Sequence, residues 1–250
     1  MDPEEDAYGQ AMVDHYEGRE TWEILERDDG WFGTSRGNDL YFEPYPEWPD
    51  RLQTAADRAE GRVLDVGCGA GRAMAHLASQ GHDALSIDVS LGAVEVCRRR
   101  GLDARELDVA DAAALDGGFD TLLMLGNNFG LVGTRERAPE VLEALAAVAS
   151  EDAVLFAESR NPTETDEEDH LAYHERNRER GRLPGALRIR VRYRRYATPW
   201  FDYLLAGPEE MRAVVADTPW TLEETIGDED GDYVGVLRPQ PADLSGADAF

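Results

Sequence analysis

Three aspartates follow three consecutive short apolar segments, and a glycine-rich loop lies beside the first of them. The segments read "VLDVGCGAGR" at 63–72, "LSIDVS" at 85–90 and "ELDVAD" at 106–111. An acid about 20 residues after the loop is the expected acceptor for ribose hydroxyls, which is the position of Asp88. Asp65, inside the loop segment, suits a ligand with a positive charge, and Asp108 is placed for the exocyclic amine of a base. Together these carboxylates favour a cationic nucleoside ligand.

The glycine spacing separates this loop from the common phosphate-binding loops. Gly67, Gly69 and Gly71 form G-x-G-x-G, whereas the dinucleotide motif G-x-G-x-x-G would need a glycine at Arg72. No GK[ST] follows, so a nucleotide-triphosphate loop is disfavoured as well. A tight strand-to-helix turn would explain the loop alone, but it would not explain the three aspartates.

Alternating strands and helices must position these residues. The apolar pattern predicts strands at 62–67, 83–88, 102–107, 119–125 and 153–159, and helices at 49–60, 71–81, 91–101 and 136–150. Ser90 is the expected cap of the third helix. A helix at 208–217 and a hairpin of 221–226 with 232–238 around "GDEDG" follow. We therefore expect an α/β fold with a doubly wound, Rossmann-like, mostly parallel sheet and a terminal antiparallel hairpin.

These segments, with "FDTLLMLGNN" at 119–128, resemble the successive motifs of class I S-adenosylmethionine-dependent methyltransferases. The resemblance covers roughly residues 50–160, and the hairpin extends it to about 238. It implies a seven-stranded sheet whose last strand is antiparallel. It also implies S-adenosyl-L-methionine as cofactor, S-adenosyl-L-homocysteine as product, and no metal.

The resemblance also implies roles for individual residues. Asp65 would lie near the amino group of the methionine part, Asp88 would hold the ribose hydroxyls, and Asp108 would accept the adenine amine. The remaining residues of the implied cofactor site are Gly67, Cys68, Gly69, Gly71, Val89, Val109, Leu125 and Gly126, with Asn127 beside the methylsulfonium.

The sequence gives less information about the methyl acceptor than about the cofactor. The fourth strand ends in "LGNNFG", which differs from the [DN]PP[YF] signature of many amino-directed DNA, RNA and protein methyltransferases. A Gly-Asn pair is somewhat similar to small-molecule N-methyltransferases. Asn127 and Asn128 are candidates for hydrogen bonding to the acceptor, and capping of the following turn is the competing interpretation.

An arginine stripe and two histidines are further candidates. In "LRIRVRYRRY" (187–196) the arginines alternate with apolar residues, so Arg190 or Arg192 could clamp a carboxylate, although an exposed face paired with nearby acids is favoured. His170 and His174 share a helix face and could act as general base, with a solvated helix face as the favoured interpretation. Zinc is disfavoured because no third ligand is evident. Trp200 and Tyr203 could line an acceptor pocket.

Two segments depart from the core pattern. Residues 1–48 are expected to form an N-terminal helical lid segment, with amphipathic helix over 1–30 and loop over 31–50. Residues 49–238 are the expected methyltransferase domain, interrupted by an inserted α+β cap at about 160–207. In the cap, 200–207 would pair antiparallel with the arginine-rich strand. Residues 239–250 are expected to be a disordered tail.

The composition indicates the environment in which the protein works. Of 250 residues, 52 are acidic against 25 basic, for a net charge of −27, and every basic residue is arginine. This resembles proteins of salt-in halophiles, where screening weakens self-repulsion. With two cysteines, no apolar run long enough for a bilayer and no signal-peptide order at the N-terminus, we expect a halophilic, cytoplasmic protein, monomer or homodimer, with no membrane contact.

The sequence therefore predicts methyl transfer from S-adenosylmethionine to the N or O atom of a small molecule. The alternatives are an RNA or protein methyltransferase and a non-catalytic S-adenosylmethionine-binding regulator. The acidity disfavours a nucleic acid at low salt, although high salt weakens that argument.

Overall fold

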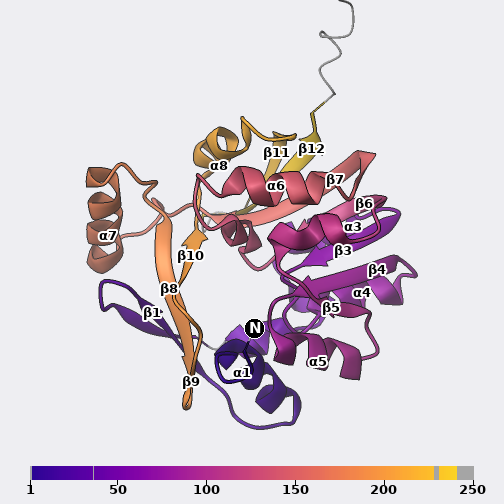
Figure 1. The fold of residues 1–250 in the computed structure, drawn as a ribbon, viewed down its shortest axis with the longest axis horizontal. Helices are drawn as coiled ribbons and strands as arrows, with labels where there is room; N and C mark the ends of the chain where they lie inside the picture. Colours follow the sequence, from indigo (N-terminus) through magenta and orange to yellow (C-terminus); the bar gives the residue numbers. More distant parts are fainter. Residues whose placement is uncertain (1, 36, 228–230, 241–250) are drawn as a thin grey trace, which may run out of the picture.

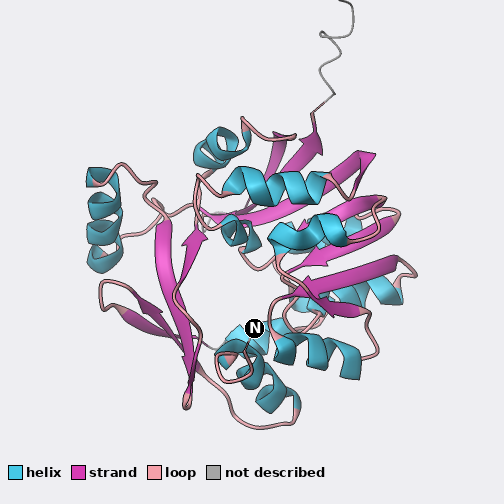
Figure 2. Cartoon of the chain, viewed as in Figure 1, coloured by secondary structure: helices cyan, strands magenta, loops and turns pink. Residues whose placement is uncertain are grey.

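A computed structural model of the chain describes residues 2–35, 37–227 and 231–240. Two β-sheets organise the molecule: a seven-stranded core sheet flanked by helices, and a five-stranded antiparallel cap sheet that stands beside it (Figures 1 and 2). The cap sheet lies opposite α5 and the strand ends of β4 and β5 (Figure 1).

The core sheet has the strand order β11-β12-β7-β6-β3-β4-β5. Pairing is parallel from β5 to β7, and β12 runs antiparallel to both of its neighbours. The doubly wound order confirms the expected α/β fold. Its strands are β3 (Arg62–Val66), β4 (Asp83–Asp88), β5 (Ala104–Glu106), β6 (Phe119–Met124), β7 (Ala149–Arg160), β11 (Trp220–Gly227) and β12 (Asp232–Pro239).

Helices cover both faces of this sheet, because its central strands are apolar on both sides. Leu52 of α3 (Asp50–Asp57) and Leu77 of α4 (Arg72–Ser79) pack in one buried cluster. Leu142 of α6 (Ala138–Ala146) and Met211 of α8 (Pro208–Val215) pack in another. The other core helices are α5 (Leu91–Arg99), η2 (Val109–Ala114) and η3 (Asn128–Val132). This packing fixes the carboxyl ends of β3, β4 and β6 at one edge.

The cap sheet joins two segments that are far apart in the sequence. Its order is β10-β8-β1-β2, and β9 pairs with β8. Its strands are β1 (Glu23–Arg27), β2 (Phe32–Ser35), β8 (Ala186–Tyr193), β9 (Tyr196–Ala197) and β10 (Phe201–Leu204). The predicted antiparallel pairing of 201–204 with the arginine-rich strand is confirmed. The other elements on this side are α1 (Ala7–Tyr16), α2 (Gly37–Tyr41) and α7 (Glu168–Glu179), whereas Tyr45 of η1 (Tyr45–Glu47) stacks on His76 of α4.

The N-terminal segment differs from the sequence expectation. The helix predicted over 1–30 ends at Tyr16, and 23–27 is strand β1, paired with β8. The loop predicted over 31–50 contains strand β2 and two short helices. The helical prediction was wrong for β1. The short order of polar and apolar side chains in β1 is compatible with both the helical period and the strand period, and pairing with the distant strand β8 selects the strand.

The ends of the predicted hairpin and tail are only partly described. Strands β11 and β12 confirm the hairpin, whereas 228–230 of its turn lie outside the described residues. Strand β12 extends through Pro239, and 241–250 of the predicted tail lie outside the described residues.

Candidate active site

The glycine loop forms the floor of the candidate site. Gly67, Gly69 and Gly71 all have positive φ, between 55° and 74°, a conformation that is strained for residues with a Cβ. A Cβ at Gly67 would also lie 2.6 Å from Nδ2 of Asn128. That Nδ2 donates to the carbonyl oxygens of Val66 (2.9 Å) and Gly67 (2.7 Å). Asn128 therefore holds the loop, which is neither of the two roles expected from the sequence.

Asp65 lies at the carboxyl end of β3 with an unsatisfied oxygen. Its side chain is 3% exposed, and Oδ2 has no hydrogen-bond partner. Burial, with the nearby Asp88 carboxylate, raises the pKa of Asp65 to about 7, and Arg72 opposes this shift. A buried carboxylate without a partner is costly unless a cationic or donor group joins it. The site thus provides a place for an ammonium group.

Asp88 ends the neighbouring parallel strand, β4. Its Oδ2 accepts from Gly69 N (3.0 Å) and its Oδ1 from Ser90 N (2.9 Å). Burial raises the pKa of Asp88 to about 6, against the lowering effect of these hydrogen bonds. The carboxylate therefore ties the glycine loop to the end of β4, and its remaining acceptor capacity is what ribose hydroxyls would use.

The residues expected around adenine occupy different environments. Val89 is 36% exposed, whereas Val109 is buried in the core. Oδ1 of Asp108 accepts from Ala110 N (2.9 Å) and from the Arg137 guanidinium (3.2 Å), so one of its oxygens is already in use.

The two cysteines lie together beneath the loop. Both are free, with 3.7 Å between Sγ of Cys68 and Sγ of Cys97. Cys97 also donates to the carbonyl oxygen of Gly69 (3.2 Å). Both thiols therefore pack the underside of the loop.

A buried glutamate orients the turn after β6, and the sequence analysis missed it. Glu158, 2% exposed at the end of β7, accepts through Oε2 from the backbone nitrogens of Gly126 and Asn127. Its Oε1 accepts from Arg51 (2.9 Å). No motif marks Glu158, although a charged residue in a buried strand is a signal in itself.

Asn127 and Leu125 flank the same turn. Asn127 has φ of 63°, and its buried Oδ1 has no hydrogen-bond partner, so this side chain is available to a ligand. Leu125 is buried in the core cluster that contains α3 and α4.

Helix α1 is fastened over the edge next to Asp88. The Asp6 carboxylate caps α1 at Gly9 N and also accepts from Ser90 Oγ (3.1 Å) and Gly92 N (2.8 Å). A Cβ at Gly92 would lie 2.5 Å from the Gly9 backbone, so α1 and α5 approach through two glycines. The N-terminal segment is thereby held against the start of α5.

Tyr203 is the predicted substrate residue that the structure brings to this edge. Its hydroxyl donates to the Asn127 carbonyl oxygen (2.7 Å), and its ring lies where a Cβ on Gly130 would be. Burial raises the pKa of Tyr203 strongly, with smaller contributions from Tyr41 and Glu158. The ring therefore lies among the side chains of the site.

The structure places Arg190, Arg192 and Trp200 elsewhere. Glu26 and Arg190 are opposite residues of β1 and β8, on the face alternate to Leu25 and Val191. The guanidinium groups of Arg190 (2.8 Å) and Arg192 (3.6 Å) pair with the Glu26 carboxylate, and Arg190 lies over the Trp200 ring. The sequence analysis favoured ion pairing on an exposed face, and these contacts agree with it.

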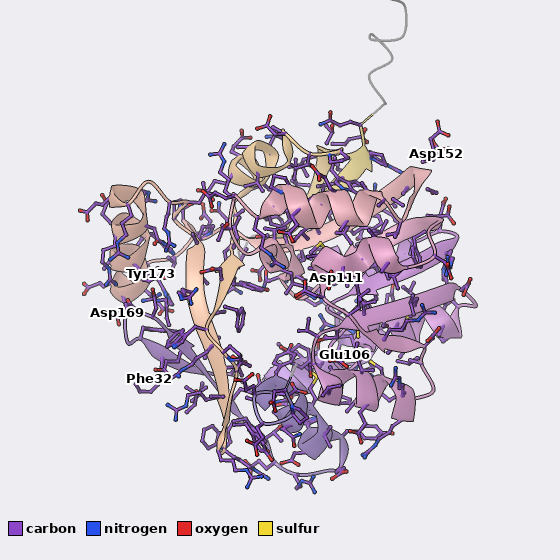
Figure 3. The ribbon with its side chains drawn as sticks, in the orientation of Figure 1. Phe32, Glu106, Asp111, Asp152, Asp169 and Tyr173 are labelled. Carbon is purple, nitrogen blue, oxygen red and sulfur yellow. The ribbon has the colours of Figure 1, made fainter. Side chains whose placement is uncertain are left out.

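His170 and His174 also lie away from the glycine loop. Both are on α7, and Asp169 and Tyr173 of this helix lie on the opposite side of the cap sheet from Glu106, at the end of β5 (Figure 3). The structure therefore does not bring either histidine to the strand ends.

Contacts within the cap account for His170, whereas Nδ1 of His174 is buried without a hydrogen-bond partner. His170 Nδ1 lies 3.0 Å from the Arg27 guanidinium, and its ring packs against Trp31. His174 is buried, which corrects the expectation of a solvated helix face, and burial lowers its pKa to about 4.

S-adenosylmethionine fits the unsatisfied atoms of this edge. Asp65 Oδ2 and Asn127 Oδ1 are buried acceptors without partners. Asp65 belongs to β3, and Asn127 follows the neighbouring parallel strand β6. The ligand carries an ammonium group and ribose hydroxyls that acidic and amide oxygens bind. Among the described residues no group of three or more His, Cys, Asp or Glu side chains could hold a metal ion.

The fold and the site define the class. Residues 63–152 match the methyltransferase domain family. The fold is that of the class I S-adenosylmethionine-dependent methyltransferases, with the expected seven-stranded, mostly parallel sheet.

Two solved structures show how similar this chain is to known methyltransferases. A S-adenosylmethionine-dependent methyltransferase from Bacteroides fragilis, solved with S-adenosyl-L-homocysteine, is 25% identical with a TM-score of 0.82, covering 96% of this chain and 98% of that one. CalS10, an amino pentose methyltransferase from Micromonospora echinaspora, shares the fold at 19% identity and a TM-score of 0.54, over 80% of this chain and 92% of that one.

A curated relative matches a shorter region. The putative methyltransferase YqeM of Bacillus subtilis is 21% identical over 118 residues, or 45% of this chain. The match spans about half, 47%, of that relative's length. No helix in the described part of the chain has the length and apolar character that crossing a membrane requires.

Proposed function

We propose that this protein transfers a methyl group from S-adenosylmethionine to a nitrogen or oxygen atom of a small molecule. The observation that carries the proposal is the unpartnered Asp65 carboxylate beside the glycine loop, with Asp88 at the adjacent strand end. Solved proteins of this fold include CalS10 and a 1,6-didemethyltoxoflavin-N1-methyltransferase from Burkholderia thailandensis, both named for small-molecule acceptors.

The protein's own residues would bind and orient the reactants. Asp65 would receive the ammonium group of the cofactor, Asp88 its ribose hydroxyls, and Asn127 would lie beside the reacting centre. When bound, the cofactor supplies an activated methyl group on a sulfonium. The remaining work is alignment of the acceptor and exclusion of water, for which α1, α2 and the cap sheet are placed.

The lid role of residues 1–48 and the cap role of 160–207 belong to this proposal. Met12 of α1 and Tyr41 of α2 lie within 3.4 and 3.6 Å of the Cβ position of Gly69, so both elements cover the glycine loop. The Asp6 contacts to Ser90 and Gly92 hold this cover closed. Asp6→Ala should therefore weaken cofactor retention, measured as a faster dissociation rate of S-adenosylhomocysteine.

The acidic composition supports the proposal of a protein adapted to high salt in the cytoplasm. The net charge of −27 predicts that the free energy of unfolding rises between about 0.1 M and about 2 M KCl, because screening weakens self-repulsion. Denaturant unfolding at both salt concentrations measures this, and a fall in stability would contradict it.

Labelled methyl transfer tests the function. The protein is incubated with methyl-labelled S-adenosylmethionine and with small-molecule or macromolecular fractions of a lysate, in molar KCl. Label in small molecules is the expected result. Label only in RNA or protein would support the macromolecular alternative, and cofactor binding without any transfer would support a non-catalytic regulator.

A further inference from the structure

A second unpartnered carboxylate lies in the cap, at the start of β1. Glu23 is 4% exposed and its Oε1 has no hydrogen-bond partner. Beside it is Asn38 of α2, 1% exposed, whose Oδ1 and Nδ2 also lack partners. The Asn38 side chain lies next to the Glu23 carboxylate and opposes the rise of its pKa. Oε1 of Glu23 is therefore the buried acceptor that a ligand would join, because a buried polar atom without a partner is costly.

Tyrosine side chains connect Glu23 to the cofactor edge. The rings of Tyr8 (α1) and Tyr41 (α2) meet edge to face at 5.3 Å. The charges of both Glu23 and Asp88 raise the pKa of each of these tyrosines, after the larger effect of burial. The two hydroxyls therefore lie within the field of both carboxylates.

The same tyrosines reach the glycine loop and the turn after β6. The Tyr41 ring is 3.6 Å from the Cβ position of Gly69. Tyr41 also contributes to the raised pKa of Tyr203, whose hydroxyl bonds to the Asn127 carbonyl oxygen. Tyr8 and Tyr41, which are within the field of Glu23, thus also pack beside the glycine loop.

The charges that act on Tyr41 are the carboxylates of Glu23 and Asp88, opposed by the Arg72 guanidinium. Strand alternation puts Glu23 on the face opposite to Glu26, which carries the ion pairs with Arg190 and Arg192. Among the residues that the structure describes, no ion pair to the Glu23 carboxylate is found. Anionic acceptors would meet unneutralised carboxylates here, whereas an ammonium would meet a carboxylate and aromatic faces, which both bind cations.

From this arrangement we propose that Glu23 binds the methyl acceptor as an ammonium ion and removes its proton, so that the substrate class is a primary or secondary amine. The inference rests on the proposed methyltransferase function and names its acceptor. Asn38 is a positioning residue that would orient the carboxylate or a neighbouring polar group of the amine.

The proton and the electron pairs balance in this step. The ammonium N–H bond breaks and its proton moves to the Glu23 carboxylate, leaving a lone pair on nitrogen. That lone pair forms the N–C bond to the methyl carbon as the S–C bond of the cofactor breaks, and the S–C electron pair remains on sulfur. The products are S-adenosylhomocysteine and a methylated ammonium, and Glu23 then releases its proton to solvent.

The acidity of Glu23 suits this role. Burial raises the pKa of Glu23 to about 7, and Asn38 opposes the shift. The titratable groups that face it are Tyr8 from α1 and Tyr41 from α2, both protonated at neutral pH because their own pKa values are raised. The rate should therefore rise with pH as Glu23 ionises near pH 7.

A matched pair of variants tests the proposal. Glu23→Gln removes the inner carboxylate without changing its shape, and Glu26→Gln is the control on the outer face of the same strand. A panel of primary and secondary amines, each paired with the alcohol and carboxylic acid of the same skeleton, is screened against the protein loaded with S-adenosylhomocysteine. Calorimetry measures binding of each probe, and labelled methyl transfer measures turnover.

The expected result is that wild type binds and methylates amines in preference to their matched alcohols and acids. Glu23→Gln should lose at least about tenfold in amine affinity and about 100-fold in turnover, with the rising limb near pH 7 abolished. Affinity for S-adenosylhomocysteine should stay unchanged in both variants, and Glu26→Gln should match wild type.

Other outcomes overturn the proposal and locate the failure. Turnover of alcohols or acids alone, or of amines without loss in Glu23→Gln, would refute the role of Glu23 while leaving the methyltransferase function intact. Absence of transfer to every probe and lysate fraction, with S-adenosylhomocysteine still bound, would refute the methyltransferase function and this inference with it.

Discussion

The core-sheet edge and the cap differ in how their polar side chains are assembled. At the core edge, Asp65 and Asp88 end adjacent parallel strands that follow each other in the chain. In the cap, Glu23, Asn38 and Tyr203 come from three separated segments that an antiparallel sheet and a short helix bring together. The proposed cofactor residues therefore lie close together in the sequence, whereas the proposed acceptor residues come together only through the pairing of distant strands.

Buried carboxylates of the molecule also differ in how their charges are satisfied. Glu158 is buried with backbone and arginine donors, and it supports the turn after β6. Asp65 and Glu23 are buried with a free oxygen each. Fully paired buried carboxylates serve stability, whereas unpaired ones are tolerated where a ligand completes them.

The largest expected effect is the loss of the paired glutamate. Glu158→Gln should lower the free energy of unfolding by about 3–5 kcal/mol, because it removes the charge buried against Arg51 and weakens two backbone hydrogen bonds. Denaturant unfolding measures it. Glu224→Gln, which breaks the exposed pair with Arg58, is the control and should cost about 0–1 kcal/mol. Equal effects would remove the distinction between the two kinds of ion pair.

A smaller effect is expected at the ribose carboxylate. Asp88→Ala should weaken S-adenosylhomocysteine binding by about 1–3 kcal/mol, because cofactor hydroxyls and the Gly69 nitrogen lose their acceptor. Calorimetry compares it with Asp83→Ala, at the exposed start of the same strand, which should bind like wild type. Unchanged affinity in Asp88→Ala would show that the ribose assignment is wrong.

The unpaired Asp65 carboxylate should make the free energy of unfolding depend on pH. Because the pKa of Asp65 is raised from 3.8 to about 7 on folding, the folded state binds the proton more tightly than the unfolded state. Stability from this group is full below about pH 4 and is lost as the pH rises to about 7. Asp65→Asn should reduce the fall in unfolding free energy between pH 5 and pH 8 by about 1–2 kcal/mol.

Denaturant titrations of ligand-free protein at both pH values give this difference. Asp83→Asn, at an exposed carboxylate, is the reference and should keep the wild-type pH dependence. A steeper fall in Asp65→Asn would contradict the raised pKa.

The smallest effect is expected on the outer face of the cap. Arg190→Ala should change the free energy of unfolding by no more than about 1 kcal/mol, because its partner Glu26 is partly exposed. Methyl transfer should stay within about twofold of wild type. A large loss of acceptor affinity would show that Arg190 belongs to the substrate site. The assignment of the outer and inner faces of the cap sheet would then be wrong.

The site features that the sequence predicted lie mainly at the core-sheet edge, and those that it did not predict lie mainly in the cap. The glycine loop, Asp65, Asp88 and the alternation of strands and helices were predicted because each motif is short and lies at a strand end. Strand β1 was mistaken for helix, and Glu23 was not considered, because a solitary glutamate in an acidic segment has no distinguishing pattern. Its environment exists only after β1 has paired with β8.

Binding of S-adenosylhomocysteine by calorimetry, compared with NAD in molar KCl, tests the central claim most directly. The account predicts one binding event per chain for S-adenosylhomocysteine and none for NAD. Binding of NAD alone would contradict the assignment of the glycine loop and its carboxylates.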